Sequence, residues 1–484
     1  MAKLVNTEKD GFDLIFNSPI FILFFLPVFL SLFFLSGIKY KNYVILAGSM
    51  VFYAWGEPRF IFIVLISSTI DWFLGNIIYK STVSRIRIWA VVLSVSLNIA
   101  ILFFFKYINF TLDNINSVLN FVNINPLIFA KVALPIGVSF VVFEKITYII
   151  DIYRGKDKPA DQFISYLLYI FLFPKLLAGP IVKYHDIKDQ LNKRLVRKDD
   201  IIYGLTRFSF GMAKKVFIAD TVGELANQCF ALSPSELGFA NAWMGAICYT
   251  LQIYFDFSAY SDMAIGLGRV MGFRIMENFN LPYISKSFTE FWRRWHISLS
   301  TWIKEYLYIS LGGNRGSKAR TYFNLWICFL ISGLWHGASW TFILWGIYHG
   351  SFLILEKLFL LEYKKKLPDL LNWATNIFFL IIGWVIFRAT SIHHVKQYLQ
   401  AMFNPFFWTG KYLYLSDNQL FFGLLGIVIC IFPLLKKHNL NHIEEISKPN
   451  SEFKYKVLLG TVLLLLSLAK VSASSYNPFL YFRF

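Results

Sequence analysis

The sequence predicts an all-α polytopic integral membrane protein, and three observations support this fold class. Hydrophobic residues make up 56% of the 484 residues, and aromatic residues alone make up 19%. Charged residues make up only 16%, whereas about 25% is typical of soluble domains. Several uncharged runs are long enough to cross a bilayer. A chain this apolar needs lipid as its solvent, which excludes disordered, fibrous and water-soluble globular classes.

Uncharged runs mark the expected spans along the chain. The run from Leu14 to Ile38 exceeds the roughly 20 apolar residues that a spanning helix needs. The run 321–355 is too long for one straight helix, so it predicts either one long tilted span or two spans with a break. Together with the shorter or interrupted runs, we expect about 11 spans. The other runs are 42–56, 60–78, 89–105, 114–150, 162–182, 201–220, 237–255, 370–387, 418–435 and 456–475.

Charged residues stand inside several of the shorter runs, among them Asp71, Lys131, Glu144 and Lys175. Charges at bilayer depth are costly and normally face a protein interior or a cavity, so we expect a bundle with polar surface inside it. The net charge of +18 comes mostly from basic residues between the apolar runs. Such charges set membrane topology, or they form a basic groove for an anionic cosubstrate. We expect no nucleic-acid partner.

Cysteine and histidine spacing indicates neither disulfides nor a metal site. The four cysteines form no CxxC pair, and the eight histidines form no HExxH pattern. The two polar loops, 183–200 and 436–456, are too short to be soluble domains. We therefore expect a single membrane-embedded domain over 1–484.

Residues 281–316 interrupt the membrane pattern with mixed aromatic and basic residues. Helical spacing places Phe288, Trp292 and Trp295 on one stripe, and Arg293, His296 and Lys304 on another. This predicts an amphipathic helix with an aromatic face, which either anchors the chain in the interface or lines a cavity. Seven Lys or Arg residues and two Glu lie between Lys286 and Arg320. The segment is thus a candidate place for a phosphate-bearing cosubstrate.

His336 lies in the middle of the long uncharged run 321–355. Its pKa near neutrality makes an imidazole in such a place a natural proton acceptor. An interhelical hydrogen bond is the alternative role for a lone membrane histidine. On one straight helix His349 would point about 220° further around, so we do not expect it to join His336.

Three longer stretches resemble the membrane-bound O-acyltransferase superfamily, and within it the alginate O-acetyltransferase branch. They read FDFSAYSDMAIGLGRVMGFRIMENFNLPY (255–283), FWRRWHISLSTWIKEYLYISLGGNRG (291–316) and SGLWHGASWTFILWGIYHG (332–350). The order of these and shorter matching pieces agrees with the family along nearly the whole chain. The resemblance implies a helical membrane enzyme with interfacial and re-entrant helices around a central funnel or tunnel, and a core of about 130–390.

The resemblance also implies an O-acetyltransferase of the bacterial cytoplasmic (inner) membrane. It implies acetyl-CoA as cosubstrate, an extracytoplasmic esterase-like partner and a polysaccharide acceptor. The implied catalyst is His336, acting as general base, and His296 occupies the second family position. Trp295 and Trp335 would wall the tunnel and exclude water. Candidates for binding the cosubstrate are Arg293, Arg294, Lys304, Asn314 and Arg315.

The C-terminal motif within 478–484 ends in FLYFRF and has two interpretations. It is an aromatic-belt anchor, or it resembles the C-terminal motif of the partner peptide in D-alanine transfer, which would make Tyr481 an acyl carrier. The competing functions are D-alanyl transfer to teichoic acid, acylation of a lipid or protein, and transport without chemistry by a polytopic transporter or exporter.

Overall fold

Helices make up all regular elements of the computed structural model. Its described residues are 14–406, 413–435, 451–473 and 479–480, and no β-strand occurs among them. Two compact units form within these ranges. The first contains residues up to 208 with 263–276 and 468–473, and the second contains 209–262, 479–480 and the described part of 277–467. The described chain is therefore all-α, as the sequence predicts.

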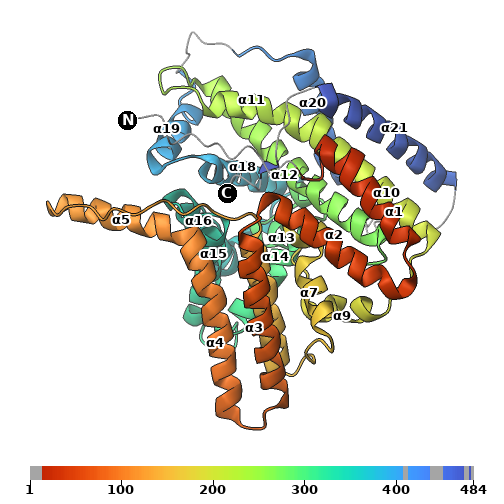
Figure 1. Ribbon diagram of the computed structural model, residues 1–484. Coiled ribbons are helices and arrows are strands. Elements are labelled where there is room, and N and C mark those ends of the chain that lie inside the picture. The colour runs from red at the N-terminus through yellow and green to blue at the C-terminus, as the bar shows by residue number, and fades with distance from the viewer. Residues whose placement is uncertain (1–13, 407–412, 436–450, 474–478, 481–484) are drawn as a thin grey trace. The chain divides into compact units, whose positions relative to one another are not determined.

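The first unit holds the N-terminal helices, in which α3 and α4 lie side by side and are joined by the short turn 81–83 (Figure 1). Helix α2 packs against α1 and α7, and α6 packs against both α3 and α4. The elements are η1 (Phe21–Phe25), α1 (Leu26–Leu35), η2 (Ile38–Tyr40), α2 (Lys41–Gly56), α3 (Phe60–Lys80), α4 (Ser84–Leu102), η3 (Phe103–Tyr107), α5 (Ile108–Phe121), α6 (Val138–Tyr153), α7 (Phe163–Phe171), α8 (Phe173–Leu176), α9 (Tyr184–Asn192) and the start of α10 (Lys198–Ala213).

Buried polar groups join α3, α4 and α6. The Asp71 carboxylate lies 3.1 Å from the Lys145 Nζ atom, and neither side chain is more than 1% exposed. Ser94 and Asn98 of α4 donate hydrogen bonds to the same carboxylate. A buried ion pair is tolerated when hydrogen bonds satisfy its remaining lone pairs, so this cluster determines how the three helices pack.

The predicted inward placement of mid-span charges holds for three of the four residues named. Asp71 is fully buried, and Glu144 forms a buried ion pair with Lys175. The expectation is wrong for Lys131, which is exposed in the irregular segment between α5 and α6. The run 114–150 therefore contains a helix break, and the Lys131 ammonium avoids burial because it lies in that break.

The second unit contains the remaining helices, with α12 as far as Asp262 and α21 as far as Ser467. Helices α15 and α16 pack closely against each other, and α16 also packs against α18. The elements are η4 (Lys214–Ala219), α11 (Asp220–Phe230), α12 (Phe239–Val270), η5 (Pro282–Ile284), α13 (Phe288–Arg294), α14 (Ile297–Trp302), η6 (Ile303–Tyr308), α15 (Lys318–His336), α16 (Trp340–Leu355), η7 (Glu356–Leu360), α17 (Leu361–Lys364), α18 (Asp369–Arg388), α19 (Ile392–Met402), α20 (Asp417–Leu435) and α21 (Ser451–Ala473).

The long uncharged run 321–355 forms two helices with a break, which is the second of the two predicted outcomes. Helix α15 ends at His336, and Ser339 caps α16 by accepting a hydrogen bond from the Phe342 N–H group. The two helices approach closely at Gly333 and Gly346. A Cβ atom at Gly333 would lie 2.2 Å from the Phe342 carbonyl oxygen, so only glycine permits this contact.

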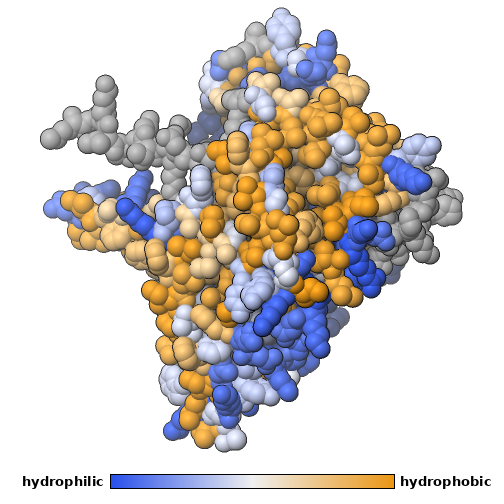
Figure 2. Space-filling view, turned by 45° about the vertical axis from the view of Figure 1, so that its right-hand side comes forward, coloured by the Kyte–Doolittle hydropathy of each residue, from blue (hydrophilic) through white to orange (hydrophobic). Residues whose placement is uncertain are grey.

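Six described helical segments are long and apolar enough to cross a membrane, and Phe21–Leu35 is a shorter apolar helix. Hydrophobic residues cover much of the face drawn in Figure 2. Large apolar side chains such as Phe62, Ile66 and Leu93 are more than half exposed, as expected of surfaces that contact lipid. The six segments are Phe60–Lys80, Ser84–Phe121, Trp340–Lys364, Asp369–Arg388, Asp417–Leu434 and Phe453–Ala473.

The predicted continuous amphipathic helix through 288–306 is wrong. Helix α13 ends at Arg294 and α14 begins at Ile297, with His296 between them in the left-handed region at φ +44°. Backbone hydrogen bonds to 278–280 cause the break, because the Ile297 N–H group donates to the Asn278 carbonyl oxygen and the Asn280 N–H group donates to the Arg294 carbonyl oxygen.

Candidate active site

His336 lies at the C-terminal end of α15, is 7% exposed and lines a small cavity in the second unit. The cavity has a volume of about 20 Å³. That is roughly the space of one or two water molecules, so it suits a small chemical group. The other lining residues are Ile253, Asp256, Phe257, Trp295, Trp345, Trp384, Phe387 and Leu480.

Aromatic rings surround the His336 imidazole on several sides. Its ring centroid lies 5.1 Å from that of Trp335, 5.2 Å from that of Trp345 and 5.3 Å from that of Phe387, each in an edge-to-face arrangement. The Trp384 ring stacks 6.4 Å from Trp345 and completes this wall. Such a shell leaves little room for water, and a proton acceptor inside it is shielded from bulk solvent.

His296 is held in a strained turn by a single asparagine. The Asn278 Oδ1 atom lies 3.2 Å from the His296 Nδ1 atom, and it also accepts hydrogen bonds from the N–H and hydroxyl groups of Ser298. The Asn278 amide nitrogen donates to the Ser261 hydroxyl, which agrees with this orientation of the side-chain amide. A non-glycine residue at positive φ is uncommon, and it persists where surrounding contacts enforce it.

The hydrogen bonds of Asn278 also determine the tautomer of His296. An oxygen that accepts from the Ser298 N–H group has no proton to offer, so the His296 Nδ1 atom must carry the hydrogen. The Nε2 atom then presents a lone pair, and it is buried without a hydrogen-bond partner among the described residues. Burial lowers the pKa of His296 to about 3, so the imidazole is neutral at physiological pH.

Asp256 connects this cavity to the end of the described chain. Its carboxylate accepts a hydrogen bond from Lys215 at 2.7 Å and another from the Leu480 N–H group at 2.8 Å. Lys215 also contacts Asp220 at 2.6 Å and lies 4.8 Å from the centre of the Phe479 ring. Leu480 lines the cavity, so the ion pair of Asp256 with Lys215 holds the tail segment, residues 479–480, next to His336.

Comparison with known proteins identifies the family. Residues 160–396 match the profile described as MBOAT, membrane-bound O-acyltransferase family. The chain is 41% identical over 490 residues to the "Probable alginate O-acetylase AlgI" of Pseudomonas putida, and the match covers 97% of this chain and 100% of that relative. The chain belongs to the membrane-bound O-acyltransferase family. It is therefore an enzyme and a multi-pass membrane protein.

Two further relatives of this acyltransferase are named for different activities. The chain is 32% identical to the "Peptidoglycan O-acetyltransferase" of Helicobacter pylori, with 98% of both chains covered. It is 27% identical to the "Teichoic acid D-alanyltransferase" of Bacillus subtilis, with 54% of this chain and 70% of that relative covered. Full-length similarity therefore extends to the two O-acetyl-transferring relatives, and the D-alanyl-transferring relative matches a shorter part.

The structure of the acyltransferase brings some predicted site residues together and leaves others apart. Trp295 lines the same cavity as His336. Trp335 is 2% exposed and its ring lies 6.0 Å from that of His296, but neither of these two residues lines the cavity. His296 instead contacts the cavity through Phe257, at a ring distance of 4.7 Å.

The residues predicted to bind the cosubstrate lie at the surface of the acyltransferase, and none of them lines the His336 cavity. Arg294 is half-buried, contacts Glu290 at 3.0 Å and donates to the Asn280 carbonyl oxygen. The exposed members are Arg293, Lys304, Asn314 and Arg315. Tyr481 lies outside the described residues.

Sequence reasoning missed two residues that organise the site. Asp256 is the first charged residue after the uncharged run 237–255. A carboxylate at the end of such a run is a candidate for a buried side chain with a specific partner. Asn278 offered no comparable signal. His349 is fully buried, and the Trp345 ring contacts both His349 at 4.7 Å and His336 at 5.2 Å. In the described chain, no group of three His, Cys, Asp or Glu side chains is placed to hold a metal ion.

Proposed function

We propose that this acyltransferase takes acetyl from cytosolic acetyl-CoA and passes it across the bacterial cytoplasmic membrane for O-acetylation of a cell-surface polysaccharide. The observation that carries the proposal is the His336 imidazole at the wall of a small apolar cavity. Full-length similarity to relatives named as O-acetylases supports the same reaction.

The transfer requires a base that can take a hydroxyl proton away from water. His336 accepts the proton of the acceptor hydroxyl while the new carbon–oxygen bond forms at the thioester carbonyl. The carbon–sulfur bond then breaks, and the proton passes from the imidazole to the departing thiolate. The aromatic shell of Trp345, Trp384 and Phe387 favours this reaction over thioester hydrolysis, because it keeps water away from the imidazole.

His296 has a separate role in the proposal. Its neutral imidazole, with Nδ1 held by Asn278, would position the acceptor or stabilise the tetrahedral oxyanion. A neutral imidazole with Nε2 unprotonated accepts a hydrogen bond, so positioning an acceptor hydroxyl agrees better with the observed hydrogen bonds. Trp295 and Trp335 would serve as walls of the acyl-transfer tunnel.

Cosubstrate binding is assigned to four basic side chains and one asparagine of the 293–315 segment. Exposed guanidinium and ammonium groups are suited to the phosphates of CoA. No metal takes part in the proposed reaction. The residues concerned are Arg293, Arg294, Lys304, Asn314 and Arg315.

The C-terminal tail would carry the acetyl group outward. Leu480 lines the His336 cavity, and Tyr481 is the next residue in the sequence. A phenol with a pKa near 10 leaves more readily than a sugar alkoxide, so a tyrosyl acetate would be a competent intermediate. An extracytoplasmic esterase-like partner would then transfer acetyl to the polysaccharide.

Acetyl fits the site better than D-alanyl. A D-alanyl group carries an ammonium that needs an anionic partner. Asp256 is the one carboxylate among the residues that line the described cavity, and it is already bonded to Lys215 and to the Leu480 N–H group.

The proposal treats 1–484 as one membrane-embedded domain with a core of about 130–390, about 11 spans and a central funnel.

The experiment follows labelled acetyl from acetyl-CoA into cell-envelope polysaccharide. Wild-type membranes should transfer label, and His336→Ala should lose transfer by roughly 100-fold or more while remaining in the membrane. His393→Ala, at an exposed histidine, is the control. Tyr481→Phe should abolish delivery to polysaccharide, because the carrier oxygen is gone. Labelled D-alanine incorporated in place of acetyl would overturn the proposed donor.

A further inference from the structure

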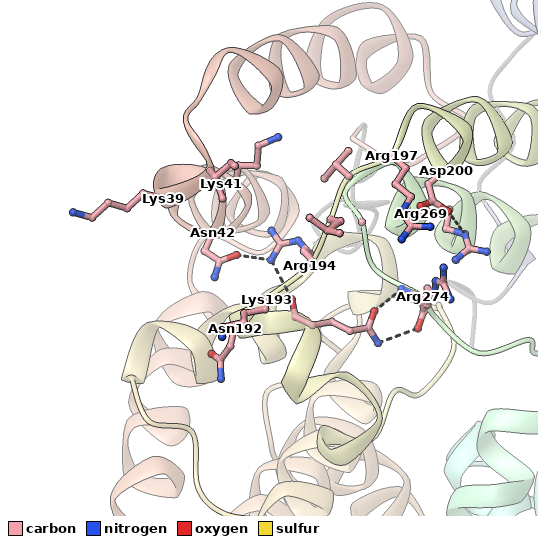
Figure 3. Close-up of a pocket in the computed structure, with 15 residues that line it drawn as sticks. Lys39, Lys41, Asn42, Asn192, Lys193, Arg194, Arg197, Asp200, Arg269 and Arg274 are labelled. Carbon is pink, nitrogen blue, oxygen red and sulfur yellow. Dashed lines mark hydrogen bonds and ion pairs between the residues drawn. The ribbon is translucent and has the colours of Figure 1, made fainter.

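A large basic pocket lies within the first unit, apart from every residue assigned to the chemistry above. It has a volume of about 840 Å³ and lies between the start of α2, the loop from α9 to α10 and the segment after α12. Figure 3 shows Lys39 and Lys41 on one side, and Arg197, Arg269 and Arg274 on the other. Seven of its lining residues are basic and one is acidic. They are Lys39, Lys41, Lys193, Arg194, Arg197, Arg269, Arg274 and Asp200.

Arg194 is built into the wall of this pocket. Its Nε atom donates to the Met271 carbonyl oxygen at 2.9 Å, and its Nη1 atom donates to the Asn42 side chain at 2.6 Å. The guanidinium also lies 4.2 Å from the centre of the Phe273 ring. These contacts fix its orientation. The Nη2 atom is buried and has no hydrogen-bond partner among the described residues, so one oriented donor is left over.

The same wall positions Arg274. The Arg274 N–H group donates to the Gln190 Oε1 atom at 2.7 Å, and the Gln190 amide nitrogen lies 3.5 Å from the Arg274 carbonyl oxygen. Gln190 also supplies its own carbonyl oxygen to Arg194. The two arginines therefore share one support, and neither depends on a ligand for its backbone position.

The positive charge of the pocket is poorly balanced. Asp200 contacts Arg269 at 3.3 Å. Among the described residues, no carboxylate lies within ion-pair distance of Lys193, Arg194, Arg197 or Arg274. Burial lowers the pKa of Arg194 only to about 10, so the group stays cationic at neutral pH. A pocket of this charge and size suits a multivalent anion larger than a single phosphate.

The surroundings of the pocket favour a membrane lipid over a soluble anion. Ile38 and Leu195 belong to its lining and are 87% and 73% exposed. Helix α1, which precedes this edge, exposes the apolar side chains of Val28, Leu32 and Leu35. A basic pocket beside lipid-facing apolar surface is where anionic headgroups gather. We propose that this pocket binds the phosphate-bearing headgroup of an anionic phospholipid, with its acyl chains along the exposed face of α1.

The test uses the full-length protein with Arg197 and Arg274 changed together to glutamine. Both side chains are exposed, and neither makes a side-chain hydrogen bond or ion pair with another described residue, so folding should be preserved. The control is the Lys80→Gln and Arg85→Gln pair, which removes the same charge at the exposed α3–α4 turn. Purified proteins are equilibrated with phosphatidylglycerol or phosphatidylcholine, and bound lipid is counted by native mass spectrometry.

Wild type and control should retain phosphatidylglycerol in preference to phosphatidylcholine. The affinity of the pocket variant for phosphatidylglycerol should be lower by about tenfold or more. Inorganic phosphate and ADP are added as soluble competitors in a second arm. Equal retention of both lipids by wild type, or an equal loss in the control variant, would overturn the proposal. Saturable binding of ADP or phosphate with no lipid preference would show that the anion is soluble.

Discussion

The Leu480 N–H group donates a 2.8 Å hydrogen bond to the Asp256 carboxylate, across 224 positions of sequence. The same carboxylate contacts Lys215 at 2.7 Å, and both acidic and basic side chains are nearly inaccessible to solvent. Asp256 and Leu480 both line the cavity of His336. One buried ion pair thus determines where the tail segment meets the candidate active site.

Asp256→Leu should release the tail without unfolding the second unit. Lys215 would keep its 2.6 Å contact with Asp220, so its charge would not be left entirely uncompensated. We expect acetyl delivery to polysaccharide to fall about tenfold or more, since an acyl carrier would no longer be held at the cavity.

The matched control for this change is Asp262→Leu, on the same helix. Asp262 pairs with Lys214 at 2.6 Å, and it is not among the residues that line the cavity. Its removal should leave acetyl delivery near the wild-type level. Equal losses in the two variants would mean that Asp256 acts through general stability and not through the tail.

Local composition predicted that long apolar helices cross a membrane, and it singled out His336 within an uncharged run. It left open whether 321–355 forms one tilted helix or two helices with a break. Uncharged runs indicate segments that lie in lipid, and the run 321–355 is longer than one straight helix across a bilayer. Lys131 was misplaced for a related reason. Composition alone does not distinguish a span from an apolar segment that lies outside any helix.

The turn at His296 and the role of Asp256 were not predictable from local pattern. Helical spacing continues through Trp295 and His296 in sequence, and the break comes from hydrogen bonds to Asn278, which lies 18 positions away. Tertiary contacts of this kind override helix propensity. The Leu480 contact is more remote still, and no periodicity connects the two partners.

Asn278→Leu should impair catalysis by disturbing the His296 tautomer. It removes the acceptor for the His296 Nδ1–H group and for Ser298. We expect the acetyl-transfer rate constant to fall about tenfold or more. Asn278→Asp, which keeps an acceptor oxygen at the same place, should retain more activity. Nitrogen chemical shifts of His296 should report Nδ1–H in wild type and a mixture of tautomers in Asn278→Leu, and an unchanged spectrum would contradict the assigned role.

Gly333→Ala should destabilise the pair of helices that presents His336. The new Cβ atom would lie 2.2 Å from the Phe342 carbonyl oxygen and 3.2 Å from the Gly346 Cα atom, so α15 and α16 would have to separate. Overpacking of this kind costs about 1–3 kcal/mol, which should appear as a lower midpoint of thermal unfolding in detergent. Gly423→Ala is the control, since its nearest neighbouring atom would be 3.9 Å away. A midpoint unchanged by Gly333→Ala would show that the helices tolerate the separation.

His185→Gln should weaken the first unit most at acidic pH. The His185 Nδ1 atom lies 2.7 Å from the Asp151 carboxylate, and this hydrogen bond raises the pKa of His185 in the folded protein above its usual value. A raised folded-state pKa means that protonation favours folding. The stabilisation is therefore complete below the unfolded-state pKa of about 6.5 and is lost as pH rises through the folded-state value. Because the side chain is 26% exposed, we expect no more than about 1 kcal/mol. The difference in unfolding midpoint between wild type and variant should be largest near about pH 5.5 and shrink by about pH 8.5. A difference that grows with pH would mean that the imidazole binds Asp151 in its neutral form.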